Sequence, residues 1–291
     1  MILKVHEPIP LSELLLKEFQ QASRTTVKKL IAHGNVRVNG KMVTNPAGQV
    51  NPGDVVEYTR QPGSRSRLKS PFRIFFEDEY MLVVEKPVGI LTVGDIGSGG
   101  TSLYKMMLDY VKESSRGKER IFVVHRLDKE VSGLLVFAKS EKIQEQIKAD
   151  WENTRKLYYV LVQGNPPKDK GTLRSWLKEG KDQHVFSSGS PEGAKLAITH
   201  YRVTDKIADY ALLEVELETG RKNQIRVHLA DMGCPVVGDR RYGAVDRFDR
   251  RIRLHAFYLS LNHPATGVPL EFKSPMPKGF LVLKEENEKY K

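Results

Sequence analysis

Short apolar segments separated by polar turns run through residues 72–217 of the chain. Those of strand length are Phe72–Phe76, Met81–Glu85, Phe122–Val124, Leu134–Ala138, Tyr158–Val162, Ala197–Val203 and Ala211–Leu217. The last segment alternates strictly, with apolar residues at 213, 215 and 217 and glutamates at 214, 216 and 218. A period of two predicts a strand with one buried face.

Helical spacing interrupts these strands three times. The predicted helices cover Ser102–Val111, Glu141–Asp150 and Asn223–Met232, and Ser140 is placed to cap the second. Strands outnumber helices, and the regular strand–helix–strand alternation of a parallel sheet is missing. The pattern therefore predicts an α+β fold on a mixed, mainly antiparallel sheet.

The first 60 residues have a different pattern. Leucines at 11, 14 and 15 have helical spacing, and a second helix is expected from Thr25 to Ala32, ended by His33-Gly34. The Asn39-Gly40 pair predicts a hairpin. We therefore expect a small α/β domain at 1–60.

The composition changes again after this segment. Residues 61–71 are rich in proline, glycine, serine and basic side chains, a composition that cannot build a core and predicts a linker. The larger domain is then expected to cover residues 72–291.

Basic side chains are in excess. Lys plus Arg total 47 against 36 Asp plus Glu, a net charge of +11, which favours a polyanionic partner, most simply nucleic acid.

The single Cys234 excludes an internal disulfide framework and a cysteine-rich zinc site, and we interpret it as core packing. Neither a membrane-spanning run nor a signal-peptide core is visible, so we expect a cytoplasmic protein that does not enter membranes.

One carboxylate, Asp128, stands in the most informative stretch of the chain. It follows the apolar segment at 121–124, and the run His125–Leu135 leads through Gly133 into the next apolar segment. Strand, polar turn, glycine and strand together present a few polar side chains at the rim of a sheet. The cationic neighbours of Asp128 favour its charged form.

Two further residues complete a candidate site. Tyr158 lies on a predicted strand, where a tyrosine can supply a platform for a base. Arg226 lies near the start of a predicted helix and could reach a carboxylate at the sheet rim. No serine or cysteine nucleophile pairs with a histidine in a recognisable signature, and the histidines at 125, 228, 255 and 263 lack zinc-site spacing. Taken singly, each residue also has a structural interpretation: a turn residue for Asp128, core packing for Tyr158 and a structural ion pair for Arg226.

Most of residues 11–58 resembles an S4-type RNA-binding domain, on the evidence of the run Thr26–Gly40. The resemblance makes Arg24, Lys28, Lys29 and Arg37 candidate phosphate contacts. An ordinary solvated helix face is the alternative interpretation of these four side chains.

The larger part of the chain resembles the RluA-type RNA pseudouridine synthases. The run His125–Leu135 matches the catalytic-aspartate motif of that family. Further segments match in family order over roughly residues 75–275: Lys86–Gly89, Lys156–Tyr158, Thr219–His228 with Gly238-Asp239, and Arg253–Ala256 with His263-Pro264. The chain departs from the usual residues of the family at Val131, Lys222, Asn223 and Cys234.

The resemblance implies that the protein isomerises uridine in RNA. The base is cleaved from C1′, rotated and rejoined through C5, after it has been flipped out of the folded RNA. Asp128 is then the catalytic group, either as a covalent nucleophile or as a base. Arg226 pairs with it and keeps it charged, and Tyr158 stacks on the target base. Arg126 is a candidate to fill the gap left by that base, and Arg221 is a further expected RNA contact. Neither a cofactor nor a metal is implied, because the reaction involves no redox change or net hydrolysis.

The choice of RNA rests on analogy alone. The S4-like module favours large-subunit ribosomal RNA over tRNA, and we expect the protein to be a monomer. A tRNA pseudouridine synthase is one alternative. A non-catalytic RNA-binding ribosome-assembly factor is another, although it would not need the complete set of Asp, Tyr and Arg. A kinase is rejected because Gly94–Gly100, interpreted as a mobile loop, lacks the Lys-Ser/Thr of a phosphate-binding loop and no Asp-Phe-Gly follows.

Overall fold

The computed structural model describes residues 2–19, 24–32, 36–58, 70–94, 101–245 and 251–280. The predicted helix end at His33-Gly34, most of the expected linker at 61–71 and most of the Gly94–Gly100 loop lie outside these residues.

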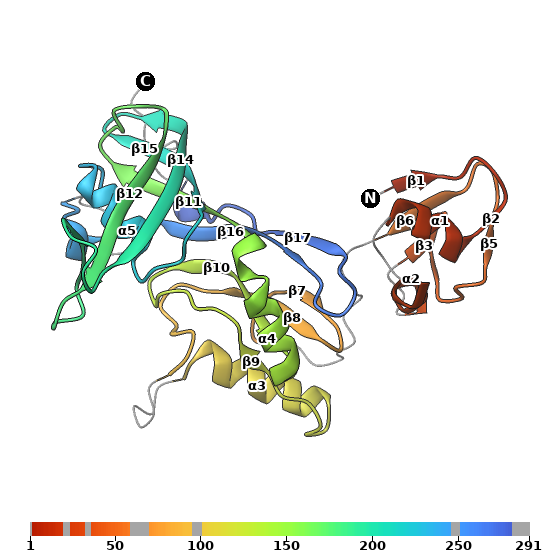
Figure 1. The fold of residues 1–291 in the computed structure, drawn as a ribbon. Helices are drawn as coiled ribbons and strands as arrows, with labels where there is room; N and C mark the ends of the chain where they lie inside the picture. Colours follow the sequence, from red (N-terminus) through yellow and green to blue (C-terminus); the bar gives the residue numbers. More distant parts are fainter. Residues whose placement is uncertain are drawn as a thin grey trace.

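Two helices pack on a small sheet in the N-terminal module (Figure 1). The sheet is antiparallel, in the order β1-β6-β3-β4. The predicted hairpin at Asn39-Gly40 is confirmed, since both residues adopt the positive φ (52° and 77°) that a tight turn between two strands requires. The elements of the module are β1 (Ile2–Lys4), β2 (Ile9–Pro10), α1 (Leu11–Glu18), α2 (Arg24–Ala32), β3 (Val36–Val38), β4 (Lys41–Val43), β5 (Gln49–Val50) and β6 (Val55–Tyr58).

An eleven-stranded sheet forms the larger domain. The path of the sheet is β13-β12-β14-β15-β11-β16-β10-β8-β7, with β17 added beside β16 and β9 beside β10. Among the described strands, only β10 and β16 pair in parallel, so the predicted mixed, mainly antiparallel sheet is confirmed. The strands are β7 (Ile74–Glu77), β8 (Met81–Lys86), β9 (Phe122–Val123), β10 (Ser132–Ala138), β11 (Arg155–Gln163), β12 (Lys170–Glu179), β13 (Val185–Ser188), β14 (Lys195–Ile207), β15 (Tyr210–Leu217), β16 (Leu254–Asn262) and β17 (Pro269–Lys273).

Helices cover this sheet with their apolar stripes. Those of α3 (Leu103–Ser114) and α5 (Gln224–Asp231) join one core cluster, and that of α4 (Glu141–Ala149) joins a second cluster with β16 and β17. Ser140 caps α4 as predicted, because its Oγ accepts the backbone N–H of Ile143 at 3.3 Å. The 3₁₀ helices are η1 (Trp151–Asn153), η2 (Arg240–Tyr242) and η3 (Lys278–Phe280).

The parallel contact between β10 and β16 is unusually close. A Cβ built on Gly133 would lie 2.2 Å from the backbone oxygen of Ala256, and Gly133 adopts a φ of +124°. Only glycine fits such an approach of two backbones. The glycine that follows Asp128 in the sequence therefore joins two parts of the sheet immediately beside the candidate site.

Candidate active site

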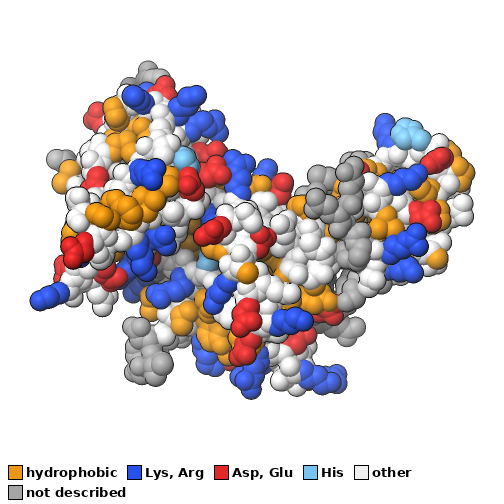
Figure 2. All heavy atoms as spheres, in the orientation of Figure 1, with side chains coloured by type: hydrophobic (Ala, Val, Ile, Leu, Met, Phe, Trp, Pro, Cys, Tyr) orange, Lys and Arg blue, Asp and Glu red, His pale blue; other side chains and the backbone are white. Residues whose placement is uncertain are grey.

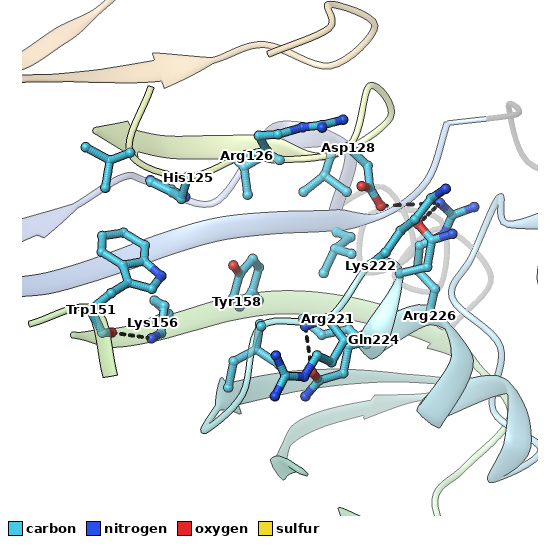
Figure 3. Close-up of a pocket in the computed structure, with 18 of the residues that line it drawn as sticks. His125, Arg126, Asp128, Trp151, Lys156, Tyr158, Arg221, Lys222, Gln224 and Arg226 are labelled. Carbon is cyan, nitrogen blue, oxygen red and sulfur yellow. Dashed lines mark hydrogen bonds and ion pairs between the residues drawn. The ribbon is translucent and has the colours of Figure 1, made fainter. Parts of the chain in front are cut away.

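Asp128, Tyr158 and Arg226 line a single cleft of about 730 Å³ in the larger domain (Figure 3). Asp128 belongs to the loop between β9 and β10, Tyr158 to β11 and Arg226 to α5. Segments that are distant in the sequence thus bring together the three side chains that the sequence singled out.

The backbone of the loop carrying Asp128 is held from below by a buried lysine. Lys86 is fully buried, and its ammonium donates to the carbonyl oxygens of Pro87, Ile90 and Lys129 at 3.0, 2.8 and 3.2 Å. Burial lowers the pKa of Lys86 to about 8, an effect that the nearby Asp128 carboxylate opposes. The lysine therefore fixes the residue directly after Asp128.

A buried threonine holds the residue directly before Asp128. The Oγ1 of Thr92 donates to the carbonyl oxygen of Leu127 at 2.7 Å and accepts the Leu127 N–H at 3.1 Å. The N–H of Val131 closes the turn on the carbonyl oxygen of Asp128 at 3.1 Å. The position of Asp128 is thus set through the backbone on both sides of it.

The carboxylate of Asp128 itself is loosely held. Its Oδ2 lies 3.5 Å from Nη1 of Arg226, which is long for a hydrogen bond between charged groups. The side chain is 35% exposed, and within the described part of the chain the carboxylate has no other hydrogen-bond partner. Asp128 can therefore offer an oxygen to a molecule in the cleft.

Arg226 takes most of its support from a different carboxylate. Its Nε and Nη2 donate to the two oxygens of Asp239 at 2.6 and 2.9 Å, and both side chains are buried. Although burial opposes the charge, the hydrogen bonds and charge of Asp239 raise the pKa of Arg226 above its usual value. The predicted contact with Asp128 is present, but it is the weaker of the two.

Asn223 and Tyr242 complete the support of the guanidinium. The Oδ1 of Asn223 accepts from Nη1 of Arg226 at 3.1 Å, while its Nδ2 donates to the hydroxyl of Tyr242 at 3.0 Å. The ring of Tyr242 lies 4.9 Å from the guanidinium carbon. Asn223 adopts a φ of +54° just before α5, a conformation that asparagine tolerates better than most residues.

Tyr158 faces the cleft from β11, whose pairing with β15 is regular at this point. Opposite Tyr158 the pairing with β16 shifts by one residue, because Phe257 of β16 is bulged out of the register. Burial and the Asp128 carboxylate raise the pKa of the Tyr158 phenol, so the hydroxyl stays protonated at neutral pH. A neutral aromatic ring thus stands near the carboxylate.

Cationic side chains dominate the lining of the cleft. Six of them line it, Arg126, Lys148, Lys156, Arg221, Lys222 and Arg226, against the two carboxylates Asp128 and Glu179. Arg126 is exposed, and Arg221, also exposed, donates from Nε to the carbonyl oxygen of Leu196 at 3.0 Å. Lys222 is occupied by an ion pair with Glu179. The cleft is suited to a polyanion that carries an aromatic base.

The predicted RNA contacts of the N-terminal module lie on its surface. Arg24 and Lys28 are exposed one turn apart on α2, and Arg37 is exposed on β3. The side chain of Lys29 is outside the described part of the structure. Figure 2 shows Lys and Arg side chains, in blue, spread over both the module and the larger domain. Contact of these residues with RNA stays a prediction.

Thr92 was not singled out from the sequence, and the two residues that hold Arg226 were not assigned a role. Asp239 was noticed only as part of Gly238-Asp239, and Asn223 only as a departure from the usual residue. The signal that could have pointed to Asp239 was Gly238. This glycine has a φ of +82° and approaches the backbone of Arg251 too closely for any side chain. Such a glycine fixes the turn that delivers Asp239 to Arg226.

The described residues contain no group of three or more His, Cys, Asp or Glu side chains suited to a metal ion. None of the helices in the described ranges is long and apolar enough to cross a membrane.

The arrangement of a carboxylate, a guanidinium and a tyrosine in a basic cleft agrees with the comparisons to known proteins. The chain matches the RNA pseudouridylate synthase family over residues 80–231 and the S4 domain over residues 10–56. It therefore belongs to the RNA pseudouridylate synthase family, whose members are isomerases that convert uridine to pseudouridine in RNA.

Similar proteins extend the match beyond the family segment. An uncharacterized RNA pseudouridine synthase of Bacillus subtilis is 35% identical over 276 residues, covering 92% of this chain and 90% of the relative. Ribosomal large subunit pseudouridine synthase D of Pasteurella multocida is 31% identical, covering 94% and 90%. The structure of human RNA pseudouridylate synthase domain containing 4 has the same fold, with a TM-score of 0.61 and 24% identity over 74% of this chain and 92% of that one.

Proposed function

We propose that this protein isomerises specific uridines of large-subunit ribosomal RNA, with Asp128 as the catalytic group. Relatives that carry the name of a large-subunit pseudouridine synthase match 94% of the chain, including its S4 domain. The observation that carries the catalytic assignment is the support of Arg226 by Asp239, which aims one guanidinium nitrogen at Asp128 beside Tyr158.

Each side chain has a role that follows from its surroundings. Asp128, partly exposed, acts on the target nucleotide either as a nucleophile or as a base. Arg226 keeps the carboxylate charged and oriented. Tyr158, protonated and fixed in β11, stacks on the flipped base. Arg126 fills the gap left in the RNA, and Arg221 contacts its backbone.

The N-terminal module, residues 1–60, is proposed to deliver this site to its RNA. Arg24, Lys28, Lys29 and Arg37 would contact phosphates there. Residues 61–71 would act as a linker to a catalytic domain at 72–291. We further propose that the protein works as a monomer in the cytoplasm, which light scattering after gel filtration and cell fractionation would check.

Mapping of pseudouridines in cells with and without the gene tests the substrate. We expect one or more large-subunit ribosomal sites to disappear on deletion and to return with the wild-type gene, but not with Asp128→Asn. If the sites that disappear lie in tRNA, the substrate assignment is wrong. If none disappears, a non-catalytic role in ribosome assembly becomes the better interpretation.

Deletion of residues 1–60 tests the module separately. We expect binding to ribosomal RNA to weaken by about a hundredfold, because the deletion removes several phosphate-binding side chains together. The unfolding temperature of residues 72–291 should change little, since the module has a core of its own. Equal RNA affinity of the truncated and full-length proteins would exclude this role.

A further inference from the structure

We propose that Lys156, held against Trp151, binds the backbone phosphate of the nucleotide next to the target uridine. This inference rests on the proposed function, because it takes Tyr158 as the platform for the target base. It adds a second subsite to the cleft, for an RNA phosphodiester.

The position of Lys156 on β11 suits this ligand. Lys156 and Tyr158 are two residues apart on one strand, so both side chains point to the same face, and both line the cleft (Figure 3). Two strand residues span roughly 6.6 Å, about the length of one nucleotide in an extended RNA strand. A cation at this distance from the target base meets the neighbouring phosphate.

The ammonium of Lys156 has donors to spare. It donates to the carbonyl oxygen of Trp151 at 3.2 Å and lies 5.3 Å from the centroid of the indole ring. Within the described part of the chain it forms no ion pair. Because an ammonium carries three N–H donors, two remain for a ligand. Burial lowers the pKa of Lys156, and Glu152 and Glu216 oppose the shift, so the charge is partly desolvated and gains most from an anion in the cleft.

The indole that holds this lysine is itself fixed. The ring of Trp151 lies 4.6 Å from that of His125, centroid to centroid, and Nε2 of His125 accepts the Val136 N–H at 3.1 Å. The partly buried indole N–H has no acceptor among the described residues. Trp151 therefore offers a second donor next to the ammonium.

Three further cations of the lining favour an anion in the cleft. Lys148, Arg126 and Arg221 have no carboxylate partner within the described ranges. Arg226 and Lys222, by contrast, are occupied by Asp239 and Glu179. The cleft therefore carries uncompensated positive charge, and Lys156 is the member of this lining that stands beside Tyr158 on β11.

The test compares charged and neutral RNA linkages by calorimetry. The probe is the trinucleotide UpUpU, with natural phosphodiesters or with uncharged methylphosphonates, and the protein is the full chain carrying Asp128→Asn to prevent turnover. We expect this protein to prefer the charged probe about tenfold. Lys156→Met should remove most of the preference and lower the slope of log Kd against log salt by about 0.7, the value for one single-strand phosphate. Trp151→Phe, which keeps an aromatic ring but loses the indole N–H, should weaken binding about threefold.

Lys112→Met is the matched control, because it removes the same charge from an exposed site on α3 outside the cleft. It should leave the preference unchanged. If the Lys156→Met protein still prefers the charged probe over the methylphosphonate probe, the proposal is overturned. The proposal is also overturned if the protein that retains Lys156 shows no such preference. Inorganic phosphate that binds as tightly as UpUpU would identify a free-phosphate site and exclude the RNA backbone. These measurements need no turnover, so they stay separate from the pseudouridine mapping that decides the proposed function.

Discussion

Asp128 and Asp239 reach the same guanidinium from two regions of the molecule, the loop before β10 and the turn before η2. Asp239 is 1% exposed and is bound through both of its oxygens, at 2.6 and 2.9 Å. Asp128 is 35% exposed and is approached by one nitrogen at 3.5 Å. The two carboxylates share a partner but differ in burial and in hydrogen bonding.

The difference indicates a division of work. A buried, bidentate ion pair is costly to disturb from either side, because the remaining charge loses its partner. An exposed carboxylate that makes one long contact can leave it for a substrate at little cost. We infer that Asp239 fixes Arg226, and that Arg226 then orients Asp128 without consuming its reactivity.

The largest expected effect is that of Asp128→Asn on activity. Pseudouridine formation should fall by at least about 10³-fold, because the catalytic group is removed. The free energy of unfolding should change by less than about 1 kcal/mol, since the ion pair between Asp128 and Arg226 is long and partly exposed. Tritium release from labelled RNA and chemical denaturation measure the two. Residual activity close to that of the wild type would contradict the assignment of Asp128.

Asp239→Asn, unlike Asp128→Asn, is expected to lower the free energy of unfolding strongly. The substitution leaves the guanidinium of Arg226 buried without its counter-charge, which should destabilise the larger domain by about 3 kcal/mol. Denaturation followed by tryptophan fluorescence would measure the loss, with Asp128→Asn as the matched control. If Asp239→Asn proves as stable as Asp128→Asn, the division of work between the two carboxylates is wrong.

Thr92→Val tests whether Asp128 is positioned through its backbone. The change preserves shape but leaves the N–H and carbonyl of Leu127 without their partner, at a cost of about 2 kcal/mol. We expect kcat to fall about tenfold while KM changes little. Thr204→Val is the control, because the Thr204 hydroxyl also donates to a backbone carbonyl, that of Leu212, but lies outside the cleft lining. Equal effects of both variants on kcat would remove the positional argument.

A chain of hydrogen bonds makes the start of β10, where the loop that carries Asp128 ends, sensitive to acid. The hydroxyl of Ser274 donates to a carboxylate oxygen of Glu85 at 2.6 Å, so its oxygen accepts the N–H at Nε2 of His255. The other ring nitrogen, Nδ1, then accepts from the hydroxyl of Ser132, the first residue of β10. Burial lowers the pKa of His255 to about 4. The histidine is thus neutral when folded, and the chain requires that form.

Stability should therefore fall in acid. The unfolded chain binds a proton at His255 below its ordinary pKa of about 6.5, whereas the folded protein resists protonation down to about 4. The contribution of neutral His255 to the free energy of unfolding is complete above pH 6.5. It is lost progressively as the pH falls to about 4, by up to about 3 kcal/mol. Unfolding temperatures measured across this range should fall less steeply in His255→Gln, where the buried His125 and His228 still contribute. They should keep the wild-type slope in His200→Gln, whose histidine is exposed. An unchanged slope in His255→Gln would contradict the argument.

Local signals in the sequence were enough to predict much of the fold. Ser140 marked the start of α4, the Asn39-Gly40 pair marked a hairpin, and the strict alternation at 211–217 marked β15. Each signal depends only on residues close together in the chain. For the same reason, Asp128, Tyr158 and Arg226 could be placed on a loop, a strand and a helix before the structure was known.

What was missed depends on tertiary contacts. The strands β1, β2 and β5 of the module and β12, β13, β16 and β17 of the larger domain were not predicted. β12 alternates in burial, but Gly171 and Ser175 share its inner face with Leu173 and Leu177, so the hydrophobic signal is weak. β16 is buried on both faces and does not alternate. The main partner of Arg226 was expected to be Asp128 and is Asp239, a choice that depends on how closely the turn at Gly238 packs on Arg251. Charge and spacing alone cannot rank two carboxylates that approach one arginine.

The parallel pairing of β10 with β16 has a consequence for the timing of synthesis. Ser132 and His255 are register partners 123 residues apart, and a ribosome that adds about 5–20 residues per second needs on the order of ten seconds to make the intervening chain. Contacts of such separation form late in folding. Until β16 has emerged and docked against Gly133, β11 with Tyr158 is not joined to β10 and the Asp128 loop. We expect an unfinished chain to be inert toward the abundant RNA of the ribosome that is making it.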